Sequence, residues 1–62
     1  MYRNVKAEQA RSRMTNQKVA ESLGISRRGY ENKLKTGRFT VDECRKLCRL
    51  FSCSFDYLFA TE

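Results

Sequence analysis

Between residues 27 and 38, five basic side chains and one acidic side chain lie close together in this chain. The basic residues are Arg27, Arg28, Lys33, Lys35 and Arg38, and the acidic residue is Glu31. Arginine can donate two hydrogen bonds to guanine, asparagine can pair similarly with adenine, and glutamate can accept from the cytosine amino group. Lysine and arginine also neutralise phosphates, which gives affinity without sequence preference. Together with Asn32, this set predicts contact with double-stranded DNA, and the alternative is an ordinary solvated helix face.

Positive charge is concentrated in the N-terminal part of the chain. The net charge is +6; residues 1–38 carry ten Lys or Arg and three Glu, which gives +7, and residues 39–62 give −1. Such a distribution suits a polyanion, namely DNA, RNA or an anionic membrane surface, or serves only to solubilise the domain. Single-stranded RNA is the less favoured partner because no strand platform with stacking aromatics is expected.

The elements that must position these side chains are five short helices, and no strand signal is present. The expected helices cover about 5–13, 16–23, 27–35, 41–51 and 55–59. The expected N-caps are Asn4, Thr15 or Asn16, Ser26, Thr40 and Ser54, and Thr40 with Glu43 has the spacing of a capping box. Gly24 and Gly37 are expected to end the second and third helices, since glycine adopts a left-handed conformation without strain.

Apolar spacing predicts which face of each helix is buried. The first helix offers a narrow stripe made of Val5, Ala7, Ala10 and Met14. The fourth offers one face made of Val41, Cys44, Leu47, Cys48 and Phe51. In the last helix, Phe55 and Leu58 are expected to close the core, which leaves Tyr57 and Phe59 for a dimer contact.

Residues 16–35 form the most informative segment. A helix, a tight glycine turn and a second helix give two helices that cross steeply, so that the second helix can enter a major groove about 12 Å wide. Such a pair needs a small residue where the helices touch, a turn glycine four positions later and an apolar anchor in the second helix. Ala20, Gly24 and Tyr30 occupy these positions.

Thr15–Arg27, with the sequence TNQKVAESLGISR, resembles the helix-turn-helix of the Cro/phage-repressor class, the XRE-like family. The closing Ser54–Phe59, SFDYLF, is similar to the last helix of that family. The resemblance spans residues 4–59. It implies an all-α, compact five-helix bundle of the lambda-repressor-like type, whose third helix reads DNA and which binds a palindromic operator as a homodimer.

The resemblance also implies a role for each matching position. Base reading falls to Arg27, Arg28, Glu31 and Asn32, and phosphate contact falls to Asn16, Gln17, Lys33, Lys35, Thr36 and Arg38. The chain departs from the family pattern at three positions. Lys33 replaces an apolar residue whose packing Leu34 is expected to take over, Gly29 replaces a larger residue, and Arg13 stands where a glycine often ends the first helix.

Length and composition argue against an enzyme. Sixty-two residues form one domain, 1–62, and such a short chain uses its few apolar side chains for a single core. With no histidine, a nucleophilic cysteine has no histidine base, and no phosphate-binding glycine loop is present. No signal-peptide core and no run of about 18 apolar residues occurs, so we expect a cytoplasmic protein without cofactor, membrane contact or small-molecule ligand.

The three cysteines allow three interpretations. Cys44, Cys48 and Cys53 could serve as zinc ligands, but structural zinc takes four ligands and no histidine exists to complete the set. Packing into the core is favoured because Cys44 and Cys48 share the apolar face of their helix. A redox-responsive thiol is the third interpretation.

The sequence thus predicts a sequence-specific, dimeric transcriptional regulator, a repressor of phage or mobile-element type. The alternative is a protein-interaction module such as an antitoxin or adaptor, which would use the aromatic C-terminus. Replacing Arg27 and Arg28 distinguishes the two hypotheses, because only the DNA-binding function depends on them.

Overall fold

Serine and threonine hydroxyls set most helix starts in this chain. The computed structural model describes residues 2–61, and these form five α-helices and no strand. The hydroxyls of Thr15, Ser26, Thr40 and Ser54 each accept a hydrogen bond from the backbone N–H three residues later. Each bond satisfies a donor that has no partner inside its helix. The helices are α1 (Arg3–Arg11), α2 (Asn16–Leu23), α3 (Arg27–Thr36), α4 (Val41–Phe51) and α5 (Phe55–Leu58).

The first helix differs from its prediction at both ends. It begins after Tyr2, whose side chain makes no capping hydrogen bond, so the predicted Asn4 cap is wrong. Asn4 lies inside the helix and donates from Nδ2 to the Tyr57 carbonyl at 2.7 Å. The helix ends at Arg11, and Arg13 follows it with φ 56°, a left-handed conformation that favours glycine.

The core is a cluster of eight buried apolar side chains drawn from all five helices: Val5, Val19, Ala20, Leu23, Tyr30, Leu47, Phe51 and Leu58. In α4 the predicted apolar face is largely confirmed, since Leu47 and Phe51 are buried and Cys48 packs against them. Val41 was placed wrongly on that face, because it is the first residue of the helix and is 69% exposed.

The predicted alanine stripe of α1 is also wrong. Ala7 and Ala10 are exposed, whereas Glu8 and Gln9 are buried beside Val5. Both polar side chains have hydrogen-bond partners, because the partly exposed Tyr57 donates to Glu8 at 2.9 Å and the buried Tyr30 donates to Gln9 at 2.6 Å. Two long polar side chains with hydrogen-bond partners therefore take the inner face in place of small methyl groups.

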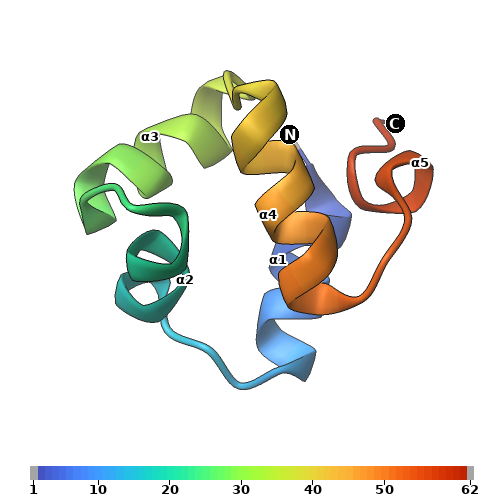
Figure 1. Cartoon of the computed structure of the whole chain (residues 1–62), viewed down its shortest axis with the longest axis horizontal. Coiled ribbons are helices and arrows are strands. Elements are labelled where there is room, and N and C mark those ends of the chain that lie inside the picture. Colours follow the sequence, from blue (N-terminus) through green and yellow to red (C-terminus); the bar gives the residue numbers. More distant parts are fainter. Residues whose placement is uncertain (1, 62) are drawn as a thin grey trace.

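The helices are arranged with α2 and α3 on one side of the molecule and α5 on the other (Figure 1). The fourth helix lies between them, in contact with α2, α1 and α5, and α1 also packs against α5. The bundle measures 25 × 23 × 18 Å. All helices within residues 2–61 are too short or too polar to span a bilayer.

Candidate nucleic-acid interface

The packing of α2 against α3 holds one face of α3 at the surface. Ala20 and Leu23 are buried in α2, and Tyr30 anchors α3 with no exposed area. Gly24 ends α2 with φ 75°, and the N–H of Ile25 donates back to the Ala20 carbonyl at 3.0 Å. The predicted small residue, turn glycine and apolar anchor are thus in the expected places.

The opposite side of α3 is polar and exposed. Arg28, Asn32 and Lys35 stand at i, i+4 and i+7, so they form one row along the helix, and all three are exposed. The Arg28 side chain makes no hydrogen bond or ion pair within residues 2–61. Arg27 is also exposed, and Gln17 lies exposed at the start of α2. The side chains of Arg28, Asn32 and Lys35 can donate to an acceptor-rich surface without breaking an internal bond, whereas Arg27 is bonded to Glu31 and Gln17 to Glu21.

The loop that follows α3 adds one further cation, Arg38, beyond the row that ends at Lys35. Lys35 and Arg38 are both exposed. Thr36 donates from its hydroxyl to the Asn32 carbonyl at 3.0 Å, and the same oxygen accepts from the Arg38 N–H at 3.4 Å. The Thr36 hydroxyl therefore helps to shape the loop from which the Arg38 side chain projects.

Lys33 is not part of this exposed set. Its Nζ lies 3.1 Å from Oε1 of Glu43 on α4 and donates to the Arg38 carbonyl at 3.2 Å. Burial alone would raise the pKa of Glu43, but the Thr40 N–H and the Lys33 ammonium outweigh burial and lower the pKa. Lys33 thus joins α3 to the start of α4, and the predicted packing role falls to Leu34, which lies against the core.

Asn16 and Glu31 are likewise bound within the protein. Nδ2 of Asn16 donates to Oε2 of Glu31 at 3.0 Å, and Asn16 is half-buried. The Glu31 oxygen also accepts from Arg27 at 3.3 Å. Lys6 on α1 lies in the same group, with Nζ 3.0 Å from Oδ1 of Asn16, and the sequence prediction missed it. Its only sequence signal is its positive charge within residues 1–38.

Gly29 lies in the first turn of α3, three residues after the Ser26 cap. A Cβ at Gly29 would stand 3.1 Å from the Ser26 hydroxyl, which caps the helix by accepting from the Gly29 N–H at 3.0 Å. The close neighbour is therefore the capping side chain, and not another backbone segment.

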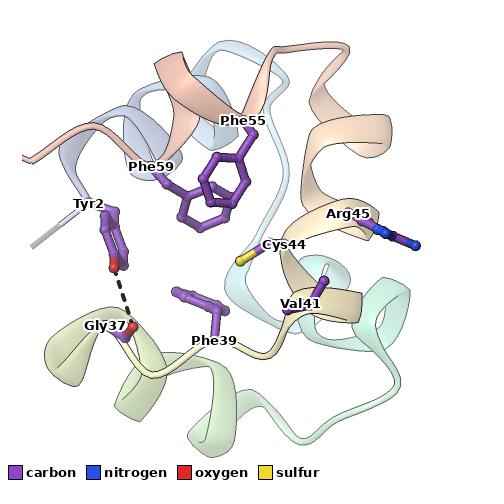
Figure 2. A pocket seen from close by; sticks show the side chains of 8 residues that line it. All are labelled: Tyr2, Gly37, Phe39, Val41, Cys44, Arg45, Phe55 and Phe59. Carbon is purple, nitrogen blue, oxygen red and sulfur yellow. Dashed lines mark hydrogen bonds between the residues drawn. The ribbon is translucent and has the colours of Figure 1, made fainter.

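A second surface feature is a pocket of about 470 Å³ between the α3–α4 loop and α5. Its lining comprises Tyr2, Gly37, Phe39, Val41, Cys44, Arg45, Phe55 and Phe59 (Figure 2). The Cys44 sulfur points into the pocket, whereas the Arg45 guanidinium points away from it (Figure 2). The pocket is thus an apolar hollow without an inward-facing charge.

Two of the aromatic residues of the C-terminus have the reverse of their predicted exposure. Phe55 is 57% exposed and does not close the core, although Leu58 is fully buried as expected. Phe59 is half-buried, because its ring stands edge-on to Tyr2 at 5.2 Å and to Phe39 at 5.8 Å between ring centroids. Tyr57 is 40% exposed, and its hydroxyl is bound to Glu8.

The cysteines are reduced and half-buried. Cys48 and Cys53 pack against the core, and Cys44 lines the pocket. Burial is the main cause that raises the pKa of all three thiols, so they are protonated and weakly nucleophilic at neutral pH. Within the part of the chain that the structure describes, no three cysteine or acidic side chains are grouped so that they could hold a metal ion.

Comparisons of this chain with protein-family models, with curated proteins and with solved structures find no match. Its function is therefore inferred from the geometry of its own residues.

Proposed function

We propose that this chain is a helix-turn-helix DNA-binding protein that acts as a sequence-specific transcriptional regulator, a repressor of phage or mobile-element type in the cytoplasm. The observation that carries the proposal is the exposed row of Arg28, Asn32 and Lys35 on a helix anchored from behind by Tyr30. A helix with its side chains is about 10–12 Å in diameter, which matches a major groove about 12 Å wide. In that position, Arg28 and Asn32 have the donors that guanine and adenine require.

Phosphate contact is assigned to Lys35 at the end of this row and to two residues beside the row. Gln17, Lys35 and Arg38 are exposed at the start of α2, near the end of α3 and in the following loop. Each cation that neutralises a phosphate releases counterions, so affinity should fall steeply with rising salt. Arg27 belongs to the reading set, whereas the internal bonds of Lys33 make it a structural cation in the free protein.

The test is selection of bound duplexes from a random pool at two salt concentrations. An enriched palindrome, with affinity that decreases as salt rises, supports operator recognition by a dimer. Arg28→Ala should relax the preference at one base pair and cost about 1–3 kcal/mol there. Arg49→Ala is the matched control, because Arg49 is an exposed arginine of α4. Weak binding with no enriched sequence, equally affected by both variants, would contradict the proposal.

The same proposal includes a homodimer, with the pocket face as its contact. Val41 and Phe55 are both large, exposed and adjacent to the pocket, which makes them better contacts than the half-buried Phe59. A stable interface covers about 800 Å² on each partner. That is about a fifth of the 4361 Å² surface of the described chain, so the contact must extend beyond the pocket.

Sedimentation at increasing concentration tests this contact. Phe55→Ala should shift the chain toward the monomer, whereas Tyr57→Phe, which keeps the ring, should leave association unchanged. If the wild-type chain stays monomeric and selects no DNA sequence, the exposed pocket face favours the second candidate function, a module that binds another protein.

A further inference from the structure

A chain of hydrogen bonds connects the buried Tyr30 hydroxyl to the exposed Arg27 guanidinium across three helices. Tyr30 donates to Oε1 of Gln9 at 2.6 Å, and Nε2 of Gln9 donates to Oδ1 of Asn16 at 2.8 Å. Nδ2 of Asn16 donates to Oε2 of Glu31 at 3.0 Å, and Nη1 of Arg27 donates to the same oxygen at 3.3 Å. These five residues are called the Tyr30–Arg27 network below.

The chemistry of its neighbours fixes each amide in the network in one orientation. The Lys6 ammonium can only donate, and it lies 3.0 Å from Oδ1 of Asn16, so the Asn16 NH₂ group must face the Glu31 carboxylate. The Met14 carbonyl can only accept, and it lies 3.1 Å from Nε2 of Gln9. Turning either amide by half a rotation would set donor against donor or acceptor against acceptor.

Because the Glu31 carboxylate is fixed, the Arg27–Glu31 pair is less mobile than an ordinary exposed ion pair. An exposed pair at i, i+4 is weak and leaves a long side chain mobile. Here the Glu31 carboxylate is already held by Asn16, and its side chain is 35% exposed. The neighbouring Arg28 has no such partner within the described residues. Two adjacent arginines of one helix therefore differ in how strongly they are restrained.

We propose that Glu31 and Asn16 are positioning residues that hold the Arg27 guanidinium in one orientation, and that Glu31 itself contacts no base. The proposal deepens the proposed function and rests on it. Ordering a long side chain before binding removes part of the entropy that is otherwise lost in the complex. For one arginine this corresponds to about 3- to 10-fold in affinity for the preferred sequence.

The measurement is the ratio of affinities for the selected duplex and a scrambled duplex. Removing an acidic charge strengthens binding to any DNA, and the ratio cancels this effect. Glu31→Ala and Asn16→Ala should each lower the ratio about 3- to 10-fold. Glu21→Ala removes the same charge from an exposed glutamate of α2 and releases the proposed phosphate contact Gln17. It should leave the ratio unchanged, because phosphate contacts are common to both duplexes.

A double-mutant cycle separates positioning from direct reading. In an Arg27→Ala background, Glu31→Ala should have no further effect on the ratio, and selection with either single variant should lose preference at the same base pair. A further loss in that background, or lost preference at a different base pair, would show that Glu31 reads DNA itself and would overturn the proposal.

Relaxation of the arginine Nε–H groups in the free protein gives a second readout that needs no DNA. Arg27 should be more ordered than Arg28, and Glu31→Ala should reduce the order of Arg27 to that of Arg28. Equal order in the wild-type chain would overturn the positioning role. A wild-type chain that orders Arg27 but selects no sequence would instead overturn the proposed function.

Discussion

Tyr30→Phe removes the buried end of the Tyr30–Arg27 network while keeping the ring that anchors α3. The Tyr30 side chain has no exposed area, and its acceptor Gln9 is 5% exposed. Its ring lies 6.4 Å from that of Phe39, between centroids, and should remain there in the variant. The substitution therefore tests one hydrogen bond, the 2.6 Å contact between the hydroxyl and Oε1 of Gln9.

The expected loss of unfolding free energy comes from Oε1 of Gln9, which is left without a hydrogen-bond donor. A buried polar atom that loses its only donor costs about 1–3 kcal/mol. At about 0.05–0.15 kcal/mol per residue, the whole domain has a free energy of unfolding of about 3–9 kcal/mol. We expect a loss of about 2 kcal/mol, which for a domain of this size lowers the melting temperature by about 8–16 °C.

The pH dependence of this loss gives a second, independent check. Burial raises the pKa of Tyr30 to about 12, from an ordinary value of 10.0. In the unfolded chain the hydroxyl ionises near pH 10, whereas in the folded chain it keeps its proton to about pH 12. Its contribution is therefore complete below pH 10 and is lost as the pH rises toward 12. The difference between wild type and Tyr30→Phe should shrink across that interval.

Urea unfolding followed by circular dichroism measures both quantities. Tyr2→Phe is the control, because the Tyr2 hydroxyl lies 3.4 Å from the Gly37 carbonyl, a long and weak bond. We expect a change below about 0.5 kcal/mol for that variant. An equally small change for Tyr30→Phe at pH 7, or a difference that stays constant up to pH 12, would refute the assignment of the bond.

Three further outcomes are expected. Lys33→Met should destabilise the fold by about 1–2 kcal/mol in urea at pH 7, because Glu43 loses its cation. Since the folded pKa of Glu43 is lowered, this loss should shrink as the pH falls below the ordinary glutamate value and Glu43 becomes protonated; a loss independent of pH would contradict the ion pair. Gly24→Ala should lower the free energy of unfolding by about 1–2 kcal/mol, measured by thermal unfolding, because an alanine is strained at a φ of 75°. No steric clash adds to this strain, since no atom lies within 4 Å of an added Cβ. Arg38→Ala should reduce the salt slope of DNA affinity by about 1 without changing the preferred sequence; a changed sequence preference would assign Arg38 to base contact.

The sequence predicted helices best where a local signal exists. The hydroxyl caps and the capping box of Thr40 and Glu43 act within four residues, and they fixed the starts of α2, α3, α4 and α5 correctly. The predicted buried face of α1 was wrong because its hydrogen-bond partners are remote in the sequence: Tyr30 is 21 residues from Gln9, and Tyr57 is 49 residues from Glu8. Helical periodicity ranks residues by hydropathy, so it cannot recognise a buried glutamine that has a distant hydroxyl partner.

At the candidate site, too, the sequence patterns missed contacts between residues of different helices. The resemblance placed Arg27, Arg28, Glu31 and Asn32 on the exposed side of α3; Arg27, Arg28 and Asn32 are at the surface, whereas Glu31 is half-buried. It did not show that Glu31 is bound by Asn16, because that contact joins two helices. In α5, one helical turn is too short for periodicity to separate Phe55 from Phe59, and the rings of Tyr2 and Phe39 make the difference.

The loop between α3 and α4 belongs to both the proposed DNA contact and the proposed dimer contact. Gly37 and Phe39 line the pocket, whereas Arg38 between them is exposed, with its carbonyl held by Lys33. A second copy seated on the pocket face would therefore immobilise the backbone on either side of a proposed phosphate contact. Coupling between two binding events is reciprocal, so DNA that orders Arg38 should strengthen self-association by the same factor. Such coupling would let the concentration of the protein set the occupancy of the proposed DNA site.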